Sequence, residues 1–137
     1  MSGSRYLPSR LLGGDFVSFR EASFTRWMSR DLLQAATDFC RNLRLLPIYA
    51  ETSAEGLTRY LFWNPPSKAA CEVRSGRAAD QFEKFAQANR ERGWPLLTLH
   101  VTEGGLFSAV WISPEAFPAA EVHLKRFGIT AAMDEAR

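Results

Sequence analysis

The sequence repeats part of itself at a distance of 48 residues. A gapless alignment of residues 47–66 with residues 95–114 gives five identities in twenty positions. The identical residues include proline, glycine and tryptophan, which fix backbone geometry or anchor a core. The matched pairs are Pro47 with Pro95, Glu55 with Glu103, Gly56 with Gly104, Trp63 with Trp111, and Pro66 with Pro114. Two copies are too few for a solenoid, so the repeat predicts a duplicated supersecondary unit within one domain.

Each copy has the pattern of a helix followed by a hairpin. Residues 31–43 and roughly 77–92 carry apolar side chains at the spacing of an amphipathic helix. Each is followed by two short runs of strand-forming residues, joined by a link that contains glycine. We therefore expect two helix–hairpin units, at residues 31–66 and 79–114, related by a pseudo-twofold axis. A short strand at 69–74 and a C-terminal helix complete the set.

These elements predict an α+β fold with the order α-β-β-(β)-α-β-β-α. We expect two layers, with an antiparallel sheet of four to five strands covered by helices. This order is similar to the fold of type III secretion chaperones, and the resemblance concerns the order of the elements alone. The chain 1–137 is expected to form a single domain, with residues 1–14 as a loose N-terminal arm and residues 131–137 as a tail.

The composition narrows the class of protein. An apolar content of 46% and a charged content of 23% are typical of a soluble globular chain. No apolar run is long enough to span a membrane, and the N-terminus lacks the apolar stretch of a secretion signal. The two cysteines, Cys40 and Cys71, favour buried free thiols over a disulfide framework. We therefore expect a cytoplasmic protein.

No recognisable catalytic or metal-binding motif occurs in the sequence. It lacks a G-x-S-x-G elbow, a phosphate-binding loop, and the H-x-x-x-H and C-x-x-C spacings of metal ligands. We expect His100 to be a solvated or edge histidine and His123 to lie at the boundary of a helix. Glu55 and Glu103 precede glycine in hairpin links, where turn chemistry explains them. The sequence thus predicts no enzymatic activity, no cofactor, no metal and no small-molecule substrate.

The second strand of each hairpin, at 57–63 and 106–112, is apolar on both faces. A sheet with one face in water alternates apolar and polar residues instead. Either the N-terminal segment covers the second face, or that face meets another protein in a homodimer or a complex. Aromatic residues and arginine are enriched at such contacts. The expected partner-binding residues are Arg59, Tyr60, Phe62, Trp63, Phe107 and Trp111.

The leading hypothesis is therefore a small non-enzymatic binding protein that acts through protein–protein contacts, as a regulator, inhibitor, adaptor or chaperone. The alternative is an arginine-mediated nucleic-acid-binding protein, because the chain has 14 arginines and only 3 lysines, and aromatic residues lie among the N-terminal arginines. Acidic residues in the same segment argue against it, and a GC-rich genome would also favour arginine. An unrecognised enzyme ranks third. The nucleic-acid alternative rests on Arg5, Arg10, Arg20 and Arg26.

Overall fold

A computed structural model describes residues 24–25, 27–41 and 44–132 of the chain. Its helices and strands follow the order expected from the sequence, and the α+β class is confirmed. The elements are α1 (Arg30–Arg41), β1 (Leu46–Thr52), β2 (Thr58–Trp63), β3 (Cys71–Arg77), α2 (Ala79–Glu91), β4 (Leu96–Val101), β5 (Phe107–Ile112), a 3₁₀ turn (Pro114–Ala116) and α3 (Phe117–Lys125).

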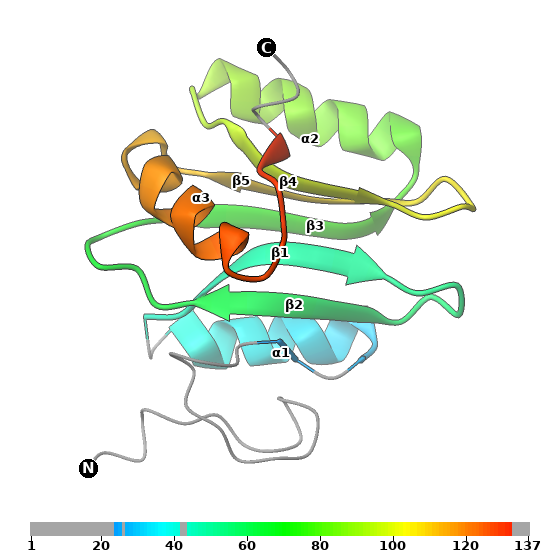
Figure 1. The fold of residues 1–137 in the computed structure, drawn as a ribbon. Coiled ribbons are helices and arrows are strands. Elements are labelled where there is room, and N and C mark those ends of the chain that lie inside the picture. Colours follow the sequence, from blue (N-terminus) through cyan, green and yellow to red (C-terminus); the bar gives the residue numbers. More distant parts are fainter. Residues whose placement is uncertain (1–23, 26, 42–43, 133–137) are drawn as a thin grey trace.

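The strands form two antiparallel sheets, not the single sheet that we expected. β1 pairs with β2, and β3, β5 and β4 form a three-stranded sheet in that order. Figure 1 shows α1 below the first sheet and α2 above the second, with α3 at the side. The prediction of two layers is therefore wrong, because the fold stacks helix, sheet, sheet and helix. Three buried clusters fill the spaces between these layers.

This stacking explains why the strands are apolar on both faces. On β2, Phe62 packs on the side of α1, whereas Leu61 packs between the sheets. On β5, Trp111 packs under α2, whereas Val110 packs between the sheets. Each strand thus has a helix on one face and the other sheet on its second face. The described segment before α1 also contributes, because Met28 belongs to the cluster with Phe62 and Phe24 packs against the cluster with Leu61.

The turns of the two hairpins are equivalent at an offset of 49 residues. The Gly56 amide donates to the Ser53 carbonyl at 3.0 Å, and the Gly105 amide donates to the Thr102 carbonyl at 2.9 Å. Both glycines have left-handed backbones, with φ of +86° and +83°, which glycine adopts without a steric penalty. The 48-residue alignment pairs Gly56 with Gly104 instead, and so it is out of register by one residue.

The strand ladders agree with the offset of 49. Phe62 pairs with Pro47, Trp111 pairs with Leu96, and the register shifts just beyond each of these pairs. Phe62 is therefore the equivalent of Trp111. A shift of one residue reverses the face of a strand, so Trp63 faces the other sheet while Trp111 faces a helix. The two tryptophans do not occupy equivalent positions, and superposition of the two units stays a prediction.

The ends of the described chain are held to the core. Phe24 forms an isolated bridge with Leu61, and Met28 forms one with Thr58, so this segment runs along the outer edge of β2. Ala131, which we placed in the tail, is buried in the cluster between the sheets because the chain after α3 turns back over it. The expected arm at 1–14 lies outside the described residues.

No helix within the described ranges has the length and apolar character needed to cross a membrane.

Candidate functional site

Most of the partner-binding residues chosen from the sequence belong to the core. The side chains of Tyr60, Phe62, Trp63 and Trp111 are at most 5% exposed. They lie in three different clusters: against α1, between the sheets and against α2. Alternate residues of each strand face different layers. Phe107 is partly exposed and stacks on a phenylalanine of α2. These residues do not form one surface.

Arg59 fastens the segment before α1 to the first sheet. Its guanidinium lies 4.7 Å from the centre of the Phe24 ring and 4.8 Å from that of Trp27. It also forms an ion pair with Glu51, whose second carboxylate oxygen accepts a hydrogen bond from the Tyr49 hydroxyl at 3.0 Å. Burial, and then the Glu51 charge, raise the pKa of Tyr49. Arg59 therefore contacts two rings and one carboxylate of the same chain, and its side chain is 36% exposed.

Three further arginines stack on aromatic rings of the same chain. Arg74 and Arg77 both contact Phe85 of α2, and Arg92 lies 3.5 Å from the centre of Trp94. Such contacts occur about once per 70–80 residues in proteins, so arginine is used unusually often here to cover aromatic side chains. This internal role accounts for part of the arginine excess. The arginines of the nucleic-acid alternative lie outside the described residues.

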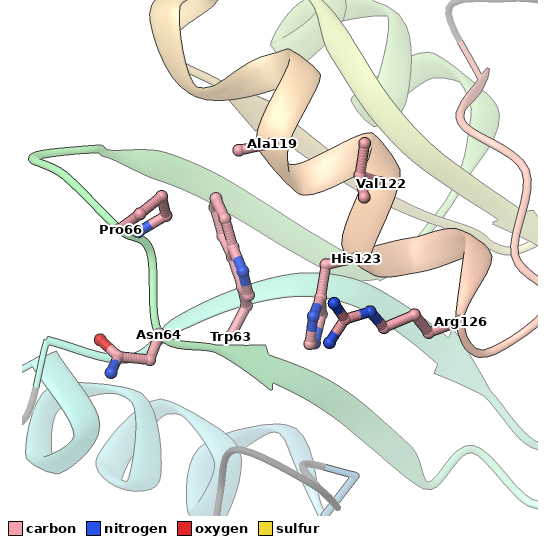
Figure 2. Close-up of a pocket in the computed structure, with 7 residues that line it drawn as sticks. All are labelled: Trp63, Asn64, Pro66, Ala119, Val122, His123 and Arg126. Carbon is pink, nitrogen blue, oxygen red and sulfur yellow. The ribbon is translucent and has the colours of Figure 1, made fainter.

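A pocket of about 490 Å³ opens between the end of β2 and α3. Its residues come from two places: the stretch at which β2 ends, and one stripe of α3 whose members are three and four residues apart. Prolines after Trp63 cannot continue the strand ladder, so the chain leaves the sheet and exposes Asn64. The lining residues, drawn in Figure 2, are Trp63, Asn64, Pro66, Ala119, Val122, His123 and Arg126.

The polar side chains of this pocket lack partners. Among the described residues, nothing accepts a hydrogen bond from the Trp63 indole or the Asn64 amide, and no carboxylate pairs with Arg126. His123 lies 6.2 Å from the Trp63 ring, centre to centre, and its buried Nε2 likewise has no partner in this part of the chain. Burial, reinforced by the Arg126 charge, lowers the pKa of His123. Both effects favour the neutral form of the imidazole.

Sequence reasoning missed most of this pocket. It selected Trp63 for a different reason, and it placed His123 at a helix boundary. Asn64 and Arg126 gave no signal of their own. The spacing of His123 and Arg126 on the last helix was visible, but only the fold shows that this stripe faces the end of β2.

A second feature is an exposed apolar strip on β4. Leu99 pairs with Ala109, and Val101 pairs with Phe107, so both side chains share the face of the sheet on which α2 packs. α2 lies over β5 and β3 and leaves this part of β4 uncovered. Leu99 is 37% and Val101 47% exposed. Within the described ranges β4 pairs with β5 alone, so its outer edge is open.

The chemistry of the remaining candidates is limited. The Cys71 thiol donates a hydrogen bond to the Pro47 carbonyl, with 3.3 Å between sulfur and oxygen. The described part of the chain has no cluster of three histidine, cysteine, aspartate or glutamate side chains that could hold a metal ion. His100 is partly exposed on β4, near the open edge.

Comparison with known proteins assigns the chain to no family: no family model, no curated protein and no solved structure matches it.

Proposed function

We propose that this chain is a small, non-enzymatic cytoplasmic binding protein that acts through protein–protein contacts and uses β4 as its docking strand. The observation that carries the proposal is the open, apolar edge of β4. A role as regulator, inhibitor, adaptor or chaperone is compatible with such a contact.

An open strand edge presents a row of unpaired backbone N–H and C=O groups to any extended chain. Proteins usually protect such an edge with lysine, proline or a bulge that twists it away. The sequence of β4, LLTLHV, has neither lysine nor proline. Its irregularity lies between Leu96 and Thr98, which leaves the half with Leu99 and Val101 regular. This half is therefore suited to strand addition, in which backbone hydrogen bonds give affinity and alternate side chains give specificity.

The occupant that we propose is a second copy of the chain. Two β4 strands that pair antiparallel about a twofold axis would bring Leu99 and Val101 of each copy to the same side of a continuous sheet. Such an isologous contact is self-complementary, and it is the commonest symmetry of soluble oligomers. It would also cover the exposed apolar strip on both copies at once.

The mass of the purified protein in solution tests this proposal. Light scattering coupled to gel filtration should give twice the chain mass of 15.4 kDa. Leu99→Lys or Val101→Lys should give the single mass, because a charge would then be placed in the contact. Leu57→Lys is the matched control. The exposed fraction of Leu57, 39%, is similar to that of Leu99, but Leu57 lies in the turn of the first hairpin. A wild-type protein that is monomeric throughout the micromolar range would refute the dimer.

A further inference from the structure

We propose that the pocket between the end of β2 and α3 binds a small monovalent carboxylate with an apolar body. This inference does not depend on the β4 contact, and it assigns a ligand chemistry to a place for which we expected none. Its volume of about 490 Å³ lies within the range of ligand-binding pockets, about 300–1,000 Å³.

The donors of the pocket argue for an acceptor-rich ligand. Within the described residues that line the pocket, the buried nitrogen without a hydrogen-bond partner is His123 Nε2, and Trp63 as a whole is 5% exposed. Here the indole of Trp63, the amide of Asn64 and the guanidinium of Arg126 all lack an acceptor in the described part of the chain. In Figure 2 the Arg126 side chain extends towards the His123 ring, which lies between it and Trp63. A ligand with acceptor oxygens beside Arg126 would supply a partner for its guanidinium.

The charge of the pocket argues for a single negative charge. Among the described residues that line it, Arg126 carries the formal positive charge and none is aspartate or glutamate. Burial, and then the Arg126 charge, lower the pKa of His123 and so favour its neutral form. One guanidinium matches one carboxylate, which it can bind through two parallel hydrogen bonds. A phosphate with two charges would be only half neutralised here.

The walls argue for an apolar body on the ligand. Pro66 stands on one side of the Trp63 ring, and Ala119 and Val122 of α3 lie on the other side of the pocket (Figure 2). Val122 is 60% exposed, the second-largest exposure among the large apolar residues described. An aliphatic or aromatic group placed between Pro66 and Val122 would remove this surface from water. The carboxylate would then lie against Arg126, beside the His123 ring (Figure 2).

Two sources could supply such a group: a free small acid, or the carboxyl end of a polypeptide with an apolar last residue. The probes are 4-methylpentanoate as the free acid and a short peptide ending in leucine with a free carboxylate. Their neutral controls are 4-methylpentanamide and the amidated peptide. Binding is followed by the ¹⁵N chemical shift of the Trp63 indole, which Trp63→Phe identifies among the four tryptophans.

We expect the carboxylate probes to shift the Trp63 indole signal and their amides to bind at least about tenfold more weakly, because a charge-assisted hydrogen bond is lost. Arg126→Gln should weaken the carboxylates by a similar factor. Arg90→Gln, an exposed arginine of α2, should not. Tighter binding of the peptide would identify a polypeptide terminus, and equal or tighter binding of the free acid a small molecule.

Any of three results would overturn the proposal: carboxylates that leave the Trp63 signal unmoved, carboxylates that bind Arg126→Gln as well as wild type, or carboxylates that bind no better than their amides. Arg126 and Asn64 are not buried, so Arg126→Gln and Asn64→Ala should fold normally. The thermal unfolding of each variant checks this point independently of binding.

Discussion

The two glycines of the second hairpin link, Gly104 and Gly105, should respond in opposite ways to alanine. Gly105 has φ of +83°, and the space that a Cβ would occupy is open, so only the backbone conformation opposes a side chain. Alanine in a left-handed conformation costs about 1–2 kcal/mol. Alanine also restricts the unfolded chain, which raises the free energy of unfolding by about 0.4–1 kcal/mol. Gly105→Ala should therefore lower the free energy of unfolding by about 0.5–1 kcal/mol.

Gly104 is the matched control, because it is the neighbouring residue in the same link. Its φ is not positive, and a Cβ would meet Thr102 Oγ1 at an ordinary 3.8 Å. Gly104→Ala should thus keep or raise stability, by up to about 1 kcal/mol. Gly56→Ala should behave as Gly105→Ala does, since Gly56 has the same conformation with φ of +86°.

Urea denaturation measures the difference between these variants. For a slope of about 2 kcal/mol per molar urea, Gly105→Ala and Gly56→Ala should each lower the midpoint by about 0.3–0.5 M, at an unchanged slope. In the 48-residue alignment the counterpart of Gly56 is Gly104. At the structural offset of 49 the counterpart of Gly56 is Gly105. If Gly104→Ala were as harmful as Gly56→Ala while Gly105→Ala were neutral, the offset of 49 would be refuted.

Three further predictions concern pH, the arginine stack and nucleic acid. The pKa of His123 is lower in the folded chain than the usual 6.5, so the unfolded chain takes up the proton first as pH drops. The free energy of unfolding should therefore fall as pH drops from about 7. His123→Phe should reduce this dependence of stability on pH, which urea titrations at several pH values would measure. Arg59→Ala should lower the free energy of unfolding by about 1–2 kcal/mol, because two ring contacts and the ion pair with Glu51 are lost. Arg59→Lys should lower it by less. Thermal unfolding would show whether the two variants differ. Intact protein should bind neither DNA nor RNA with a steep salt dependence, and truncation of residues 1–14 should lower stability or partner affinity instead. Tight binding whose salt slope fell by about one unit for each arginine lost would restore the nucleic-acid alternative, the arginines to replace being Arg5, Arg10, Arg20 and Arg26.

Local structure was predictable here because local signals determine it. Apolar spacing placed the helices at 31–43 and 77–92, close to the observed α1 and α2. Gly93, which follows α2, has a left-handed backbone with φ of +80°. Its equivalent at an offset of 49 is Arg44, which adopts φ of +60°. No pattern would select arginine for that conformation, so the correspondence is visible only in coordinates.

The arrangement of the sheets was not predictable for a physical reason. Apolar residues on both faces of β2 and β5 show that both faces are buried, but they do not show what covers them. A helix, a second sheet and a partner all satisfy the same pattern. The offset of the repeat failed for a related reason, because the adjacent Gly104 and Gly105 offer two matches to Gly56 and only the φ angles decide between them. The pocket joins segments some sixty residues apart, which no local signal connects.

The ends of the two hairpins show why the pocket belongs to the first unit alone. At an offset of 49, Asn64 corresponds to Ser113, which follows β5. The Ser113 amide donates to the Ala70 carbonyl at 2.9 Å, and its hydroxyl accepts from the Ala70 amide at 3.1 Å. Ser113 thus holds the chain entering β3, and its polar groups are occupied.

Asn64 has no such partner among the described residues. Trp63 corresponds to Ile112, a fully buried side chain without any hydrogen-bonding group. Where the second unit has an aliphatic residue and an occupied serine, the first has an indole N–H and an amide that both remain available. The end of β2 thus offers a ligand two donor groups that the end of β5 does not.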